Sequence, residues 1–138
     1  MTPKDLIAQA LEAREMAYAP YSSFKVGAAL LTRDEKVYRG CNIENAAFSP
    51  TNCAERTAIF KAISEGERAF AALAVVADTT DVCRPCGVCR QVMAEFFSSD
   101  VLIIMANQAG KWETATVEEL LPGAFGPAEL DGDRIQHA

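Results

Sequence analysis

Three cysteines and one glutamate in the sequence have the types and spacing of a catalytic metal site. Cys86 and Cys89 lie three residues apart at the start of a predicted helix, where both side chains can face one metal ion. Cys53 lies at another predicted helix start, and Glu55 follows two residues later. The free amide groups of a helix N-terminus favour a thiolate over a thiol. The four residues therefore indicate metal chemistry.

Each motif has an alternative explanation when it is taken alone. Structural zinc knuckles and redox dithiols share the C-x-x-C spacing of Cys86 and Cys89. Asn52 and Glu55 have the spacing of a helix capping pair, and Cys53 also fits a small buried hydrophobic residue. The presence of both motifs in one chain favours a catalytic metal site, because helix starts that follow strands can converge at one edge of an α/β sheet. Three protein ligands leave one position of a tetrahedral zinc open for water, which is the catalytic arrangement.

Cys83 opens two further alternatives. With Cys86 and Cys89 it has the spacing of part of an iron–sulfur motif, but the expected fourth cysteine and following proline are missing, with Met93 at that place. As a fourth thiolate, Cys83 would instead close the zinc site and make the domain a binding module. Three of the five cysteines lie between positions 83 and 89, which favours metal ligation in a reducing compartment over disulfide bonds. Cys41 fits a buried strand residue.

Composition limits the class of protein. The length of 138 residues, of which 50% are hydrophobic, predicts one domain over residues 1–138. The net charge of -6 disfavours a nucleic-acid partner. The one histidine, His137, is expected to lie in a mobile tail, which disfavours nucleophiles that a histidine activates. The sequence has no signal-peptide pattern and no apolar run of membrane-spanning length, which predicts a cytoplasmic protein with no membrane partner.

These residues need a framework of helices and strands. The first half predicts a helix that Thr2 caps and that ends before Pro20, a hairpin of strands over 24–31 and 37–41, and a helix from an Asn52 cap to about Glu65. The second half predicts strands over 73–77 and 101–106 and a helix between them. The side chains that this helix turns to the core are expected to be Val88, Val92, Met93, Phe96 and Phe97. A short helix follows, which Thr116 and Glu119 cap. The uninterrupted apolar strands require helices on both faces. The alternation predicts a layered α/β fold.

The paired C-x-E and P-C-x-x-C motifs resemble those of the zinc-dependent nucleoside and nucleobase deaminases, with cysteine in place of the usual first histidine. Five stretches extend the resemblance to the small homotetrameric cytidine deaminases: 24–30, 40–46, 51–58, 85–92 and 120–125. The similarity covers roughly positions 4 to 126. It implies a three-layer α/β/α fold with a mixed sheet, one zinc ion per chain and a homotetramer.

The resemblance also implies an activity, the hydrolysis of free cytidine and 2'-deoxycytidine to uridine and 2'-deoxyuridine plus ammonia in pyrimidine salvage. Cys53, Cys86 and Cys89 would hold the zinc ion, which lowers the pKa of a bound water towards about 7. Glu55 would move protons from the water to ring nitrogen 3 and to the departing amine. Arg56 would donate hydrogen bonds to the thiolates and offset their negative charge.

The resemblance assigns the substrate contacts as well. Asn42 and Glu44 would bind the ribose hydroxyls, Phe24 would flank the nucleoside, and the backbone of Ala54 would hold the base. Phe125 resembles the aromatic residue that a neighbouring subunit places over the base. Without the resemblance, Asn42 and Glu44 fit solvated strand-end residues, and Phe24 fits the core.

Two other deaminase classes share the core chemistry. A polynucleotide-editing deaminase would need a basic surface, and the net charge of -6 argues against one. A deaminase of nucleoside-like antibiotics would differ mainly in its pocket residues. The matches at Phe24, Asn42, Glu44 and Phe125 favour cytidine over such a substrate.

Overall fold

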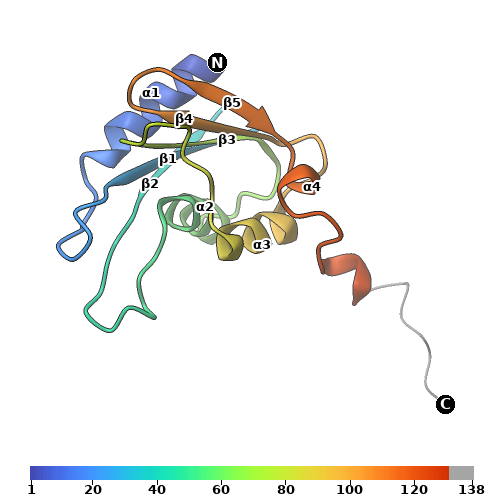
Figure 1. Ribbon diagram of the computed structural model, residues 1–138. Coiled ribbons are helices and arrows are strands. Elements are labelled where there is room, and N and C mark those ends of the chain that lie inside the picture. The colour runs from blue at the N-terminus through green and yellow to red at the C-terminus, as the bar shows by residue number, and fades with distance from the viewer. Residues whose placement is uncertain (131–138) are drawn as a thin grey trace.

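A five-stranded sheet lies between helices on its two faces in the computed structural model (Figure 1). The structure describes residues 1–130, and His137 with the predicted mobile tail lies outside the described residues. The elements in chain order are α1 Pro3–Arg14, β1 Val26–Thr32, β2 Val37–Cys41, α2 Ala54–Ser64, β3 Phe70–Ala77, α3 Gly87–Phe96, β4 Leu102–Asn107, β5 Trp112–Ala115, α4 Val117–Leu120 and the 3-10 helix η1 Pro127–Glu129. Among the described residues, none of the helices has the length and apolar character that a membrane crossing requires.

The sheet is mixed, and its strand order is β2-β1-β3-β4-β5. Only the central β3 and β4 run parallel, and the other neighbouring strands among residues 1–130 pair antiparallel. Side chains of β3 alternate between two hydrophobic clusters because successive residues of a strand point to opposite faces. Ala72, Ala74 and Val76 join the cluster under α1, whereas Leu73, Val75 and Ala77 join the cluster under α2 and α3. The three-layer α/β/α prediction is confirmed.

Two glycines allow helices to approach the sheet more closely than a side chain would permit. A Cβ atom on Gly27 of β1 would lie 1.9 Å from the carbonyl oxygen of Ala10 in α1. A Cβ atom on Gly40 of β2 would lie 2.4 Å from the carbonyl oxygen of Ala54 in α2. The strand β2 therefore contacts the first turn of α2 directly, immediately after the predicted metal ligand Cys53.

Gly40→Ala is expected to lower the free energy of unfolding by about 3 kcal/mol, the upper end of the range for overpacking. The added methyl group would meet backbone atoms of α2, which cannot rotate away. Urea unfolding measures the change. Gly87→Ala is the matched control, because a Cβ atom there meets no described heavy atom within 4 Å and alanine favours a helix. Equal stability of Gly40→Ala and the unmodified protein would contradict the close approach.

The first helix ends earlier than the sequence predicts. The amide groups of Met16 and Ala17 bond to the carbonyl groups three residues earlier, which tightens the chain after Arg14. The Tyr18 amide then donates to the Asn42 carbonyl group at 3.0 Å. Ala17 therefore lies outside α1, although its spacing fits the apolar stripe, because the chain already turns towards the segment that follows β2.

The predicted N-cap of α2 is also wrong by one residue. Cys53 is the N-cap, and within the described structure its side chain makes no capping hydrogen bond. Asn52 instead donates from its side-chain amide to Thr57 Oγ1 at 3.1 Å. The proposed capping pair of Asn52 and Glu55 does not form, because the helix starts one residue later than its polar residues indicate.

Two further differences concern exposed residues. Val88 of α3 is 58% exposed, because the buried side of this helix follows Cys89 and Met93 and Val88 lies one residue off that stripe. The edge strand Trp112–Ala115 is missing from the prediction, since its mostly exposed residues have no apolar alternation. The hairpin of β1 and β2 and the capping box of α4 agree with the prediction.

Candidate active site

Two helix N-termini from distant parts of the chain bring the three predicted thiols together. Cys53 is the N-cap of α2, Cys86 is the N-cap of α3, and Cys89 lies in the first turn of α3. In the described part of the chain, neither N-cap side chain makes a capping hydrogen bond to its own helix. The sulfur atoms of the three cysteines all lie within 4.8 Å of one another. The sequence prediction of this cluster agrees with the geometry.

The sulfur positions fit a tetrahedral zinc ion. Zinc–sulfur bonds of about 2.3 Å at tetrahedral angles place two sulfur atoms about 3.8 Å apart. Cys53 Sγ and Cys86 Sγ are separated by 3.8 Å. Thiolates are soft ligands that suit zinc, and three of them leave a fourth position for a water molecule or a substrate. The donor set and its spacing therefore match a catalytic rather than a closed site.

Cys83 is not part of the cluster of potential ligands found among residues 1–130. It is buried beside the site, and its amide donates to the Ala106 carbonyl group at 3.0 Å. Burial raises the pKa of the Cys83 thiol to about 12, and its sulfur atom lies outside the group formed by Cys53, Cys86 and Cys89. The geometry argues against the four-cysteine binding module.

Charge at the cluster is balanced by Arg56, which lies one turn into α2. Its Nη2 atom donates to Cys53 Sγ at 3.1 Å. The hydrogen bond from Cys89, together with Arg56, holds the pKa of Cys53 well below its ordinary value, and the same bond raises the pKa of Cys89. Arg56 Nε is buried and has no hydrogen-bond partner within residues 1–130. The guanidinium group therefore stabilises negative charge here and keeps one donor free.

Glu55 is 4% exposed and points from the first turn of α2 into the same site. Burial raises the pKa of Glu55 to about 7, because a carboxylate loses its hydration in the interior. A carboxyl group with a pKa near neutrality can both accept and release a proton during a reaction. This property matches the predicted role of Glu55.

A cavity of about 220 Å³ adjoins the thiols. Of the predicted site residues, its lining includes Phe24, Asn42, Cys53, Ala54, Glu55 and Cys86. The structure therefore brings two metal-ligand candidates, the proton-transfer candidate and three of the predicted substrate contacts to one cavity.

Asn42 is buried and arranges the wall of this cavity. Its Oδ1 atom accepts from the Val26 amide at 2.9 Å, and its Nδ2 atom donates to the Phe24 carbonyl group at 2.7 Å. These bonds hold the segment that leads into β1, with the half-exposed ring of Phe24 at the cavity rim. An amide group has one further hydrogen and a further lone pair, so Asn42 can also bond to a ligand.

Glu44 lies in a neighbouring cavity of about 400 Å³. Its carboxylate accepts from the amides of Tyr21 and Ser22 at 2.9 Å and 3.1 Å, and also from the Ser22 hydroxyl group. The Ser22 hydrogen bond lowers the pKa of Glu44. Thr51 lines both cavities, so the two adjoin.

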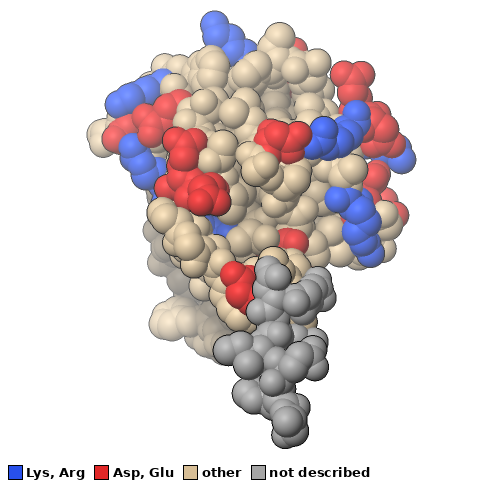
Figure 2. All heavy atoms as spheres, turned by 90° about the vertical axis from the view of Figure 1, so that its right-hand side faces the viewer, with Lys and Arg blue, Asp and Glu red and all other residues tan. Residues whose placement is uncertain are grey.

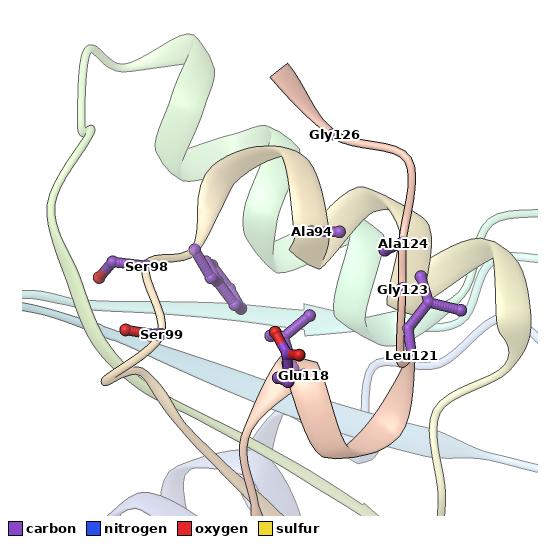
Figure 3. A pocket seen from close by; sticks show the side chains of 10 residues that line it. Ala94, Ser98, Ser99, Glu118, Leu121, Gly123, Ala124 and Gly126 are labelled. Carbon is purple, nitrogen blue, oxygen red and sulfur yellow. The ribbon is translucent and has the colours of Figure 1, made fainter. Parts of the chain in front are cut away.

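Phe125 does not line the cavity that adjoins the thiols of its own chain. Its ring is 58% exposed, and its carbonyl group accepts from Gln91 Nε2 of α3 at 2.7 Å. Figure 3 shows the segment from Leu121 to Gly126 running past α3, beside a third cavity of about 270 Å³. The ring of Phe125 is therefore largely exposed and outside the cavity beside the thiols of its own chain.

The cavity wall also contains residues that were not predicted for the site, among them Val26, Thr51, Asn52 and Arg84. Arg84 is held by Asp81 at 3.3 Å and by Glu113 at 3.1 Å. Thr51, Asn52 and Arg84 each lie within two residues of Cys53 or Cys86, and this proximity to a motif is the signal that could have identified them.

Residues 1–105 match the family described as "Cytidine and deoxycytidylate deaminase zinc-binding region". The chain belongs to the cytidine and deoxycytidylate deaminase family. All three clustered thiols and Glu55 lie inside the matched region, so the deaminase family accounts for both cysteine motifs. The chain is accordingly an enzyme of a hydrolase family with a zinc-binding region.

Individual relatives agree with this family. The chain is 57% identical to the cytidine deaminase of Sporosarcina psychrophila over 130 residues, 94% of this chain and 96% of the relative. It is 56% identical to the cytidine deaminase of Halalkalibacterium halodurans over 126 residues, 91% of this chain and 96% of the relative. The crystal structure of cytidine deaminase from Burkholderia pseudomallei superimposes with a TM-score of 0.89 at 51% identity, over 91% of this chain and all of that one.

Proposed function

We propose that the chain is a zinc-dependent cytidine deaminase that converts free cytidine and 2'-deoxycytidine to uridine and 2'-deoxyuridine. The observation that carries the proposal is the cluster of Cys53, Cys86 and Cys89 at a cavity that buried Glu55 also lines. The names of the relatives support cytidine as the substrate. Such a reaction would serve pyrimidine salvage, since it returns a free nucleoside to the uridine pool.

The residues of the chain divide the chemistry between them. Zinc held by the three thiolates would supply the Lewis acidity that makes water a nucleophile at neutral pH. Glu55 accepts one proton from the attacking water and delivers it to ring nitrogen 3, then accepts the remaining proton from the new hydroxyl group on carbon 4 and delivers it to the amine. The oxygen of water bonds to carbon 4, the bond from carbon 4 to the amine breaks, and ammonia leaves.

Arg56 and the two helix N-termini keep the metal an effective Lewis acid. Three thiolates would give a divalent ion a net charge of -1, which weakens its pull on water. The hydrogen bond from Arg56 to Cys53 and the positive ends of α2 and α3 withdraw part of that charge. We assign Arg56 this compensating role.

The cavity wall supports the proposed substrate contacts. Ala54 is the first residue of α2, and the amide of such a residue has no acceptor within its helix, so the backbone can hold the base. Phe24 flanks the nucleoside, and Asn42 has hydrogen-bonding capacity for a ribose hydroxyl group. Glu44 reaches the ribose from the neighbouring cavity, across the wall that Thr51 forms.

A free nucleoside fits the surface charge better than a polynucleotide. On the face shown in Figure 2, Lys and Arg side chains are interspersed with Asp and Glu and with uncharged surface. The whole chain has a net charge of -6. Binding to a phosphate backbone depends on clustered basic side chains. The charge distribution therefore supports a small substrate.

We propose that the chain forms a homotetramer in which neighbouring subunits complete each site. Five large apolar residues on two adjacent loops are between 43% and 73% exposed: Tyr18, Tyr21, Phe24, Ile43 and Phe48. Exposed apolar groups of this kind mark interaction sites. A second copy that covers these loops would place a chain near the cavity. Phe125 of one chain would then lie over the base bound to another.

Phe125→Ala is expected to weaken transition-state binding by about 1–3 kcal/mol, the range for loss of an aromatic group stacked on a base. Steady-state kinetics with cytidine measure this as a fall in kcat/KM. Phe60→Ala is the control, since Phe60 is also a half-exposed phenylalanine. Mixed assembly of Phe125→Ala chains with Glu55→Gln chains should restore activity, because each supplies what the other lacks. Equal kinetics of Phe125→Ala and Phe60→Ala would contradict the role of Phe125.

The first test of the function is the ultraviolet absorbance of cytidine with the purified protein, together with metal analysis. Conversion to uridine with about one zinc ion per chain supports the three-thiolate site. Zinc without conversion would overturn cytidine as the substrate, and a metal-free active enzyme would overturn the zinc mechanism.

We further propose that residues 1–138 form a single deaminase domain in the cytoplasm. Both hydrophobic clusters of the described residues share one sheet, which supports one domain. Its five cysteines are free thiols, and a reducing compartment keeps thiols available for metal binding.

A further inference from the structure

The loop of residues 78–85 joins β3 to α3 and determines where Cys86 and Cys89 lie. Asn107 ends β4 beside this loop, directly opposite Ala77 in the parallel pair of strands. Asn107 is 3% exposed. Asn107 is thus a buried amide next to the loop, and it is not one of the proposed substrate-binding residues.

The side chain of Asn107 makes three hydrogen bonds across this junction. Nδ2 donates to the carbonyl groups of Thr79 and Thr80 at 3.1 Å and 3.3 Å. Oδ1 accepts from the Lys111 amide at 2.9 Å. Only an amide offers two donors and an acceptor in this arrangement, because a carboxylate cannot donate. Asn107 therefore links the start of the loop to the turn between β4 and β5.

Two more contacts fasten the same loop to the same strands. Lys111 Nζ forms an ion pair with Asp81 at 2.8 Å. The Cys83 amide donates to the Ala106 carbonyl group at 3.0 Å. The loop is thus bonded at its start, middle and end to the end of β4 and the turn that follows it, and Arg84 adds an ion pair with Glu113 of β5 at 3.1 Å, two residues before Cys86.

We propose that Asn107 is a positioning residue for the zinc ion, acting through the loop of residues 78–85. This inference rests on the zinc site proposed above. Cys53 is placed by the contact of α2 with β2, whereas Cys86 is placed by this loop. The separation of 3.8 Å between their sulfur atoms depends on the contact of α2 with β2 and on the position of the loop of residues 78–85. Asn107 holds that loop in place.

Asn107→Asp tests the proposal, with Gln108→Glu as the matched control. Both replace an amide by a carboxylate of the same shape, but Gln108 is exposed. We expect the zinc affinity of Asn107→Asp to fall about tenfold or more, within the range for residues that orient metal ligands, and that of Gln108→Glu to stay unchanged. Competition with a chromophoric chelator measures the affinity. The absorption bands of the cobalt-substituted protein should shift in Asn107→Asp alone.

A merely structural role gives a different result. It would lower the unfolding free energy of the metal-free and zinc-loaded proteins equally, with unchanged zinc affinity and an unchanged cobalt spectrum, and that result would overturn the proposal. If the buried charge of Asn107→Asp prevents folding, Asn107→Ala with Gln108→Ala as control makes the same comparison, with the same two outcomes. If the unmodified protein does not bind zinc, the proposed zinc site itself is overturned. If the unmodified protein binds zinc and the Asn107 variant and its control bind it equally well, only the role of Asn107 is overturned.

Discussion

Glu55→Gln is expected to keep the fold and the bound zinc ion while kcat for cytidine falls by about 10²–10⁴-fold, the contribution of general acid–base catalysis. Glutamine has the shape of glutamate and keeps hydrogen-bonding atoms in the buried site, so the first turn of α2 remains intact. It cannot accept the proton of water or return one to the ring. Steady-state kinetics and metal analysis of the same preparation separate lost proton transfer from lost metal.

Glu65→Gln is the matched control for this experiment. Glu65 is the exposed C-cap of the same helix, so the exchange removes the same charge far from the cavity. We expect its kcat to equal that of the unmodified enzyme. Full activity of Glu55→Gln would remove Glu55 from the mechanism, and loss of zinc from that variant would instead assign it to metal binding.

Cys86→Ser should weaken zinc binding, whereas Cys83→Ser should leave it unchanged. Cys86 is exposed, so serine there disturbs little of the core but replaces a thiolate ligand by a hydroxyl group. We expect zinc affinity to fall by at least about 100-fold, since a three-ligand site loses one of its ligands, and turnover to disappear with the zinc. Metal analysis after dialysis against a chelator measures the loss.

Cys83→Ser should retain about one zinc ion per chain and full turnover, because three thiolates suffice for a catalytic site. A modest loss of stability is expected, since the exchange places a hydroxyl group in an apolar position. Zinc loss with unfolding in Cys83→Ser would favour the closed four-cysteine module. Retention of zinc by Cys86→Ser would contradict the assignment of the ligands.

The thiol cluster could be predicted from the sequence because its information is local. Cys86 and Cys89 share one helix turn, and Cys53 opens another helix. The spacing within each motif is local, and the conjunction of the two motifs together with the family resemblance indicated the cluster. The apolar runs of β3 and β4 likewise reveal a sheet covered on both faces. These features depend on residues that are close in the chain.

Features that depend on contacts between distant segments escaped the prediction. The two hydrogen bonds from Asn107 to residues 79 and 80 join positions nearly thirty residues apart, and no periodicity marks them. The edge strand β5 is held by backbone pairing with β4 rather than by an apolar pattern. Glu44 remains a predicted substrate contact, and its cavity and its bonds to the loop at Tyr21 and Ser22 follow only from the three-dimensional arrangement.

The direct contact between β2 and α2 at Gly40 gives the two halves of the site different tolerance to sequence change. In the half that carries Cys53 and Glu55, the backbone of β2 at Gly40 lies directly against the backbone of α2. We therefore expect selection to remove most substitutions of Gly40. The half that carries Cys86 is attached through hydrogen bonds and ion pairs, among them the exposed ion pair of Asp81 with Lys111. Laboratory evolution of a new metal preference should therefore accumulate its substitutions in residues 78–85 and leave Gly40 untouched.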